Sequence, residues 1–271
     1  MELTRRSALK TLVAGGVGLT TGTAVYGYGY ARHELGVTGA TLPVRRLPPA
    51  LDGLRIALVT DLHRSETVSH EQVADAAALA NSLEADLIVL GGDYVTWGDR
   101  SYVTPAAEAL AALTAPHGVY AILGNHDDDR AMPAALERQG FVVLKDARTR
   151  ITIRGETLDL VGIRFWTRRE EEIAPLLKGT APATILLAHD PRRLTEAAAL
   201  DVPLVLSGHT HGGQIVLPVV GALAGRKFPV LAGPARREST TLFVSRGVGT
   251  VYVPIRLNCP PEVALLTLQA A

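Results

Sequence analysis

Acidic, amide and imidazole side chains recur in five short motifs along the chain. In chain order, the candidate ligands that they supply are Asp61, His63, Asp93, Asn125, His189, His209 and His211. Oxygen and nitrogen ligands without a thiolate suit manganese, iron or zinc. One ion does not need so many ligands, whereas two ions about 3.5–4 Å apart that share a carboxylate would use them all. The motifs therefore predict two divalent or mixed-valence transition metal ions.

Such a pair of ions favours the hydrolysis of phosphoesters. Two divalent ions, two carboxylates and a bridging hydroxide leave a net positive charge, which attracts phosphate and stabilises the extra charge of the transition state. Metal binding also lowers the pKa of water towards neutrality, so that a metal-bridging hydroxide attacks phosphorus directly. The motifs leave open whether the substrate is a phosphomonoester or a phosphodiester.

An apolar run of strand length precedes each motif. These runs are residues 56–59, 87–90, 119–123, 184–188 and 204–206. Helix-like stretches near 70–83 and 105–113 lie between the first three runs, which indicates an α/β fold. In such folds ligands bind beyond the carboxyl ends of the strands, so the motifs are expected to meet in one crevice. Each motif alone is typical of a turn or a helix cap, but five at strand ends favour a metal centre.

The motifs and their order resemble the calcineurin-like metallophosphoesterase family, from about residue 54 to the C-terminus. The resemblance implies a four-layer α/β/β/α sandwich with the site at the strand ends. It further implies that Asp61, His63 and His211 hold one metal, that Asp93 bridges, and that Asn125, His189 and His209 hold the other. Asp93 and His126 are then the catalytic residues, and His126 stabilises the transition state or protonates the leaving group.

The N-terminus has the pattern of an export signal. Arg5 and Arg6 precede residues 11–31, which contain no charged residue. The arginine pair indicates the twin-arginine route. The uncharged run is also long enough to span a bilayer, so a signal peptide and a retained membrane anchor both fit.

These patterns divide the chain into three parts. Residues 1–32 are the signal peptide or anchor, residues 33–52 a proline-containing linker, and residues 53–271 the metallophosphoesterase domain. The expected location is the cell envelope, in the periplasm or on the outer face of the cytoplasmic membrane. The expected partners are the twin-arginine translocase during export and a membrane contacted through residues 11–31.

Composition excludes several classes of protein. The 271 residues are 47% hydrophobic and 20% charged, which is typical of a globular protein. The net charge is zero, which gives little electrostatic attraction for long nucleic acid. This neutrality combines +3 in residues 1–32 with −3 in the remainder. A single cysteine, Cys259, allows no internal disulfide and no thiolate cluster.

Two arginines are candidates for substrate binding. Arg64 lies next to the first motif and Arg246 lies in a Ser-Arg-Gly turn. Both can bind a non-scissile phosphate or a carboxylate, although each also fits an ordinary surface charge. The leader and the C-terminal segment resemble the twin-arginine-exported bacterial branch of the family. That branch implies a small or lipid-linked phosphoester, such as an envelope lipid, a nucleotide sugar or a nucleotide. The alternative is a non-catalytic metal-binding or scaffold protein on the same fold, which predicts missing ligands; none is missing here.

Overall fold

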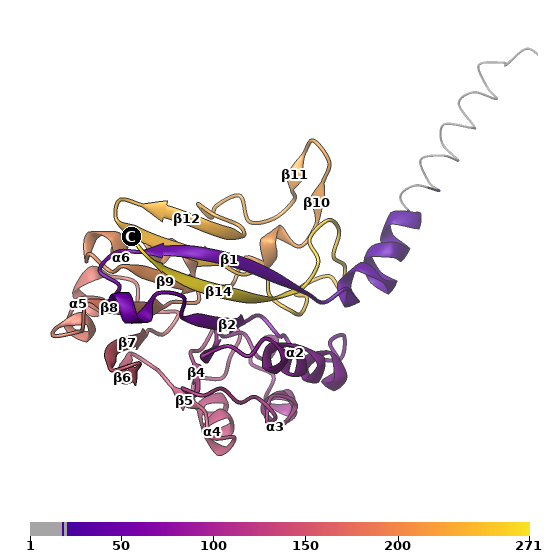
Figure 1. Ribbon diagram of the computed structural model, residues 1–271. Coiled ribbons are helices and arrows are strands. Elements are labelled where there is room, and N and C mark those ends of the chain that lie inside the picture. Colours follow the sequence, from indigo (N-terminus) through magenta and orange to yellow (C-terminus); the bar gives the residue numbers. More distant parts are fainter. Residues whose placement is uncertain (1–17, 19–20) are drawn as a thin grey trace, which may run out of the picture.

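Two six-stranded mixed sheets form the body of the molecule (Figure 1). The computed structural model describes residue 18 and residues 21–271. Arg5 and Arg6, together with the first part of the uncharged run at residues 11–31, lie outside the described residues. The predicted export signal therefore stays a prediction.

The first sheet has the strand order β1-β14-β2-β3-β4-β5. Its strands are β1 (Gly36–Val44), β14 (Glu262–Ala270), β2 (Arg55–Val59), β3 (Leu87–Leu90), β4 (Val119–Ala121) and β5 (Val142–Val143). Only the pairing of β14 with β2 is antiparallel. All four residues of β3 are buried apolar residues, as expected of a parallel strand covered on both faces.

The second sheet has the order β12-β13-β9-β8-β7-β6. Its strands are β12 (Gly233–Arg237), β13 (Thr240–Val244), β9 (Leu204–Ser207), β8 (Ala183–Leu187), β7 (Glu156–Gly162) and β6 (Ala147–Ile153). The central pairings are parallel, and β12 and β6 run antiparallel to their neighbours at the two edges. A separate two-stranded hairpin consists of β10 (Val216–Leu217) and β11 (Gly221–Ala222).

Helices cover the outer faces of the two sheets and complete four layers. They are α2 (His70–Ser82), α3 (Val103–Ala109) and α4 (Ala131–Arg138) on the first sheet, and α5 (Glu170–Leu177) and α6 (Leu194–Ala199) on the second. The short 3-10 turns are η1 (Ala31–His33), η2 (Pro49–Leu51), η3 (Arg100–Tyr102), η4 (Pro191–Arg193) and η5 (His211–Gly213). One apolar core lies between the sheets and contains Ile56, Leu87, Leu160, Ile185 and Leu206. The expected α/β/β/α arrangement is therefore present.

The sequence places the first long helix correctly and the second only approximately. Ser69 begins α2 with a capping box, in which its hydroxyl accepts from the N–H of Gln72 and the Gln72 side chain accepts from Ser69 N–H. The helix expected near residues 105–113 begins earlier and ends at Ala109.

The segment expected to be a linker contributes a strand to the first sheet. Residues 36–44 form β1, which pairs with β14 in parallel from Gly36–Glu262 to Val44–Ala270. Leu42 and Val44 are buried in the core between the sheets. Because β1 is an edge strand, the sheet tolerates Pro43 within it. The prediction of a linker over 33–52 is corrected accordingly.

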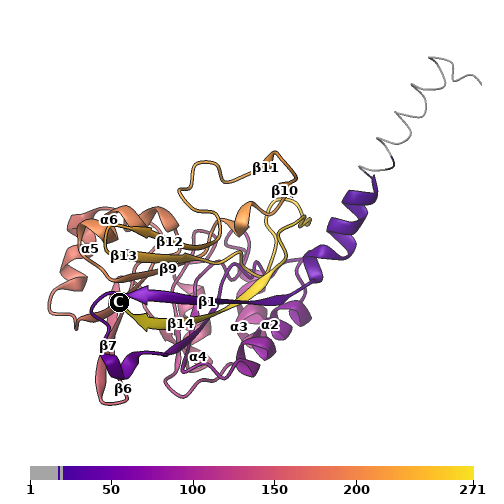
Figure 2. The same ribbon diagram turned by 45° about the horizontal axis from the view of Figure 1, so that its top comes forward.

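Residues 21–29 form a helix, which we call the N-terminal helix. The carbonyl of Gly27 accepts a hydrogen bond from Arg256 N–H at 3.2 Å, so the helix contacts the C-terminal part of the domain. Figure 2 shows this helix on the same side of the sheets as the β10–β11 hairpin, with the C-terminus at the opposite end. Within residue 18 and residues 21–271, no helix has both the length and the apolar character needed to cross a membrane.

Candidate metal centre

The predicted ligands meet where strands of both sheets end. Asp61 and His63 follow β2, Asp93 follows β3, Asn125 follows β4, His189 follows β8, and His209 and His211 follow β9. Six of these seven residues fall into two groups whose ligand atoms lie within 4.8 Å of one another. The central strands are parallel in both sheets, so their carboxyl ends converge on one crevice.

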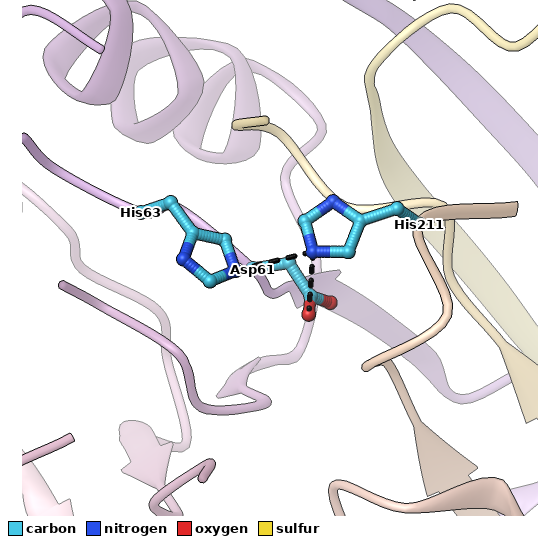
Figure 3. A group of neighbouring side chains, drawn as sticks. All are labelled: Asp61, His63 and His211. Carbon is cyan, nitrogen blue, oxygen red and sulfur yellow. Dashed lines mark hydrogen bonds and ion pairs between the residues drawn. The ribbon is translucent and has the colours of Figure 1, made fainter. Parts of the chain in front are cut away.

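The first group consists of Asp61, His63 and His211, all buried (Figure 3). The Nε2 atoms of the two histidines are 3.1 Å apart, and His211 Nε2 lies 3.5 Å from Asp61 Oδ1. Two ring nitrogens at this separation need a proton or a cation between them. A metal ion at this point would be held by one carboxylate and two imidazoles.

The second group consists of Asp93, His189 and His209. His189 Nε2 lies 3.1 Å from Asp93 Oδ2, and the same oxygen lies 3.5 Å from His63 Nε2 in the first group. One carboxylate oxygen is therefore placed between the two groups. Nearby, Asn125 Oδ1 is buried and has no hydrogen-bond partner within the described part of the chain, which is the state expected of a ligand oxygen.

Hydrogen bonds to the outer ring nitrogens orient two of the histidines. His189 Nδ1 lies 2.7 Å from the carbonyl oxygen of Gly91 and so donates its proton there. His63 Nδ1 contacts Thr96 Oγ1 at 3.2 Å. In both rings Nε2 is left facing the other ligands, and this arrangement is typical of metal-binding histidines.

Burial and neighbouring charge set the protonation of the ligands. Burial raises the pKa of Asp61 to about 6, lowers that of His63 to about 4, and lowers the pKa of His211 well below its usual value. Burial would also raise the pKa of Asp93, but the adjacent His189 outweighs it and lowers that pKa. An ionised carboxylate and neutral imidazoles are the forms that bind metal. Burial would lower the pKa of His189, but Asp93 and Asp61 outweigh it and raise that pKa to about 10, so a metal ion at this ring would displace a proton. The carboxylate, amide and imidazole ligands fit two divalent transition metal ions.

The backbone at the ligands is strained. Asp61, His63, Asp93, His209 and His211 all have φ between 51° and 73°, a region that L-residues rarely adopt and that is enriched at functional sites. The neighbouring glycines make room for these turns. A Cβ added at Gly124 would overlap the Asp93 carboxylate, and one at Gly208 would overlap that of Asp61.

His126 lies beside the two groups but belongs to neither. Its Nδ1 accepts a hydrogen bond from Trp97 N–H at 3.0 Å, so in the neutral ring the proton is on Nε2. Burial lowers the pKa of His126 and favours that neutral form. The ring centroid lies 4.9 Å from that of His63, and His126 lines the adjoining cavity. The arrangement suits a hydrogen-bond or proton donor next to the metals.

Comparison with known proteins agrees with this geometry. The family model described as calcineurin-like phosphoesterase matches residues 54–213. The chain belongs to the calcineurin-like phosphoesterase family.

Two relatives and one solved structure indicate how far the similarity extends. The phosphoesterase is 33% identical to a bovine (Bos taurus) transmembrane protein with metallophosphoesterase domain, over 100% of this chain but only 65% of the bovine protein. It is 31% identical to the phosphodiesterase YaeI of Escherichia coli (strain K12), over 79% of this chain and 82% of that protein. The structure of Haemophilus influenzae NAD nucleotidase (NadN) is 16% identical with a TM-score of 0.50, covering 72% of this chain and 45% of that one. This last similarity shows the fold alone.

A carboxylate that sequence reasoning left without a role joins two of the ligand loops. Asp127 accepts hydrogen bonds from the backbone N–H groups of Asp93, Tyr94 and Gly124 at 2.7–2.8 Å. Burial raises the pKa of Asp127 to about 7. In the sequence, the position of Asp127 at the end of the Gly-Asn-His-Asp motif is the feature that could have indicated this role. Asp127 thus fixes the loop after β3 against the loop after β4 in the phosphoesterase.

A cavity of about 330 Å³ opens beside the ligands. The polar residues of its lining include Asp93, Asn125, His126 and His209 at the ligands, and Lys227 from the loop after the hairpin. The other walls are largely apolar and include Ile215, Leu223, Phe228, Val251, Tyr252 and Val253. The cavity can therefore hold a phosphate at the ligands and an apolar group next to it.

Two buried polar side chains that the sequence did not single out hold the cavity wall in place. Gln214 Nε2 donates to the carbonyls of Val251 and Val253 at 3.2 and 2.7 Å, and its Oε1 accepts from Val251 N–H at 3.0 Å. The fully buried Arg256 donates to carbonyls that include those of Gly249 and Cys259. Only the fold reveals these roles, because the partners are backbone groups.

The structure pairs the two candidate substrate-binding arginines with the protein itself. Arg64 donates to the carbonyls of Ser65 and Val68. Arg246 forms an ion pair with Glu262 at 2.5 Å and donates to Thr38 Oγ1 at 2.9 Å. The residues that line the described cavity include neither arginine, whereas Lys227 is among them. A role of Arg64 or Arg246 in substrate binding stays a prediction.

Proposed function

We propose that this chain hydrolyses phosphodiesters at a dinuclear metal centre. The observation that carries the proposal is the position of Asp93 Oδ2, 3.1 Å from His189 Nε2 and 3.5 Å from His63 Nε2. A carboxylate oxygen so placed can bridge two ions, as in two-metal phosphoester hydrolysis. The name of the E. coli relative, a phosphodiesterase, supports diesters over monoesters.

The chain's own residues have separate tasks in this reaction. Bound ions would supply an activated water nucleophile and neutralise charge on the phosphoryl oxygens. His126 presents its Nε2 proton to the leaving oxygen, because Trp97 N–H occupies Nδ1. The apolar cavity walls accommodate the group attached to the phosphate. These apolar walls favour phosphodiesters that carry an apolar or aromatic group.

Activity should depend entirely on metal loading. Removal of metal with a chelator is expected to abolish hydrolysis of bis(p-nitrophenyl) phosphate, and reloading with manganese, iron or zinc should restore it, because the bound ions would supply the activated water. The measurement is the turnover rate before and after reloading. Unchanged hydrolysis by metal-free protein would rule out the proposed chemistry.

A non-catalytic scaffold is distinguished by the same assay. Protein that takes up two ions per chain but hydrolyses neither phosphomonoesters nor phosphodiesters, in a panel that includes nucleotide sugars and phospholipids, would support the scaffold. We expect hydrolysis of at least one diester in that panel, since six of the seven predicted ligands fall into two groups that could each hold a metal ion.

We further propose that the protein is exported by the twin-arginine route and acts in the cell envelope. The support is Arg5-Arg6 followed by the uncharged residues 11–31. Replacing both arginines by lysine should retain the protein in the cytoplasm, because the route reads the arginine pair. Cell fractionation measures this, with Arg236→Lys/Arg237→Lys as the matched control. Envelope localisation of the Arg5→Lys/Arg6→Lys variant would contradict twin-arginine export.

A further inference from the structure

Exposed apolar side chains gather on one side of the molecule, around the mouth of the cavity. Five of them form what we call the apolar rim: Val219, Val220, Leu223, Tyr252 and Val253. Leu223, Tyr252 and Val253 line the cavity, and Val219 and Val220 form the tip of the β10–β11 hairpin beside it. Val219 is fully exposed and Tyr252 is 76% exposed. Patches of this kind mark interaction surfaces.

The N-terminal helix extends the same surface. Val25, Tyr26, Tyr28 and Tyr30 are exposed large side chains on or next to this helix. The helix contacts the segment that follows the rim, since Gly27 accepts from Arg256. Helix and hairpin leave the body on the same side in both views (Figures 1 and 2). Ten of the thirteen exposed large hydrophobic side chains of the described residues belong to the helix, the rim or Trp97, which packs on Tyr252.

The hairpin and the loop after it are basic. Residues 213–231 contain two basic residues and no acidic residue, although residues 33–271 as a whole carry −3. Glu66 lines a neighbouring hollow with Tyr252 and Val253. Arg226 and Lys227 are exposed in the loop that follows the hairpin. Apolar tips flanked by basic side chains are the combination that binds anionic lipid surfaces. A second copy of this chain would bring the same positive charges together.

We infer that the apolar rim docks on an anionic lipid bilayer, so that the cavity faces the membrane surface. The helix of residues 21–29 lies on this same side, and the uncharged residues 11–20 precede it in the sequence. The helix and the hairpin tip then contact one bilayer together, and aromatic side chains at such positions favour the headgroup region. Docking of the rim does not depend on catalysis. Its consequence, preference for a phosphodiester carried by a lipid, rests on the proposed function.

A fluorophore on the rim of the full chain tests the docking. The probe is an environment-sensitive dye on Val219→Cys, and the matched control carries it on Val142→Cys, an exposed valine of β5. The native Cys259 is buried and leaves the new thiol as the labelling site. With phosphatidylglycerol-containing vesicles, the dye at residue 219 should shift to the blue and be quenched by lipid-attached quenchers, while the dye at residue 142 should not respond.

A charge at the hairpin tip gives a second, independent readout. Val219→Asp/Val220→Asp should weaken partitioning into these vesicles by roughly tenfold or more, since two apolar contacts are lost and repulsion is added. Turnover of soluble bis(p-nitrophenyl) phosphate should stay unchanged, whereas turnover of a vesicle-borne phosphodiester should fall. The control substitution is Val142→Asp.

Three outcomes would overturn the docking. Vesicle binding with no response at residue 219 would assign all membrane contact to the N-terminal segment. A blue shift without vesicles, together with a doubled mass in solution, would assign the rim to a second copy. A response only to an added protein would assign it to a protein partner. If no substrate is hydrolysed, the proposed function fails while the dye response still decides the docking.

Discussion

Asp93→Asn is expected to lower kcat/KM for phosphodiesters by roughly 10³-fold or more, with the fold retained. Its Oδ2 lies between His189 and His63, and an asparagine would place a neutral amide there, with one ligand oxygen in place of a charged carboxylate. Substitution of a residue that hydrogen-bonds to a metal ligand typically lowers metal affinity or activity by about 10–100-fold. The loss of the bridging charge should cost more. The measurements are kcat/KM, metal content and circular dichroism.

The control for this variant is Asp99→Asn, an exposed aspartate on the neighbouring loop. Asparagine preserves its capping of Ser101 N–H, so activity should be close to that of the native protein. Substantial turnover by a folded Asp93→Asn variant, with two ions still bound, would show that Asp93 does not bridge.

His126→Ala is expected to retain both metals and to lower kcat by roughly 10²–10⁴-fold for a phosphodiester with an alkoxide leaving group, the usual contribution of a general acid. The reason is its geometry. The backbone N–H of Trp97 donates a hydrogen bond to His126 Nδ1 at 3.0 Å, so Nε2 carries the transferable proton. His126 also lies outside both groups of ligands, so its loss should leave the metals bound. The measurements are kcat and metal content of the purified variant.

The leaving group provides the sharper test of His126. The loss should be small for p-nitrophenol, which departs without protonation, and large for an alkoxide, which needs the proton. His70→Gln, at an exposed histidine that begins α2, is the matched control and should change neither rate. Loss of metal from His126→Ala, or an equal loss with both leaving groups, would show that His126 has another role.

The sequence could predict the strands that deliver the ligands because each ligand follows its strand directly. Asp61 follows the apolar run of β2, and His189 follows that of β8. Parallel strands place such residues at one edge whatever the details of packing. The pattern missed β1, since only one face of this edge strand is buried and its partner, β14, is more than 200 residues away. Local periodicity carries no information on such a pairing.

The walls of the site could not be predicted from the sequence, for a similar reason. Gln214 holds the cavity wall through backbone carbonyls, and any residue type supplies a carbonyl. Arg246 looked available for substrate, but its ion pair with Glu262 forms only when β14 joins the sheet. The ligand chemistry is therefore visible in residue types, whereas the surroundings of the ligands depend on tertiary contacts.

The central claim is that two ions bound per chain carry out the hydrolysis. Its most direct test titrates metal into metal-free protein while measuring bound metal and phosphodiester turnover in the same sample. We predict a plateau near two ions per chain, with full activity only when the second ion is bound. A plateau at one ion, or full activity with one or no ion bound, would contradict the dinuclear mechanism.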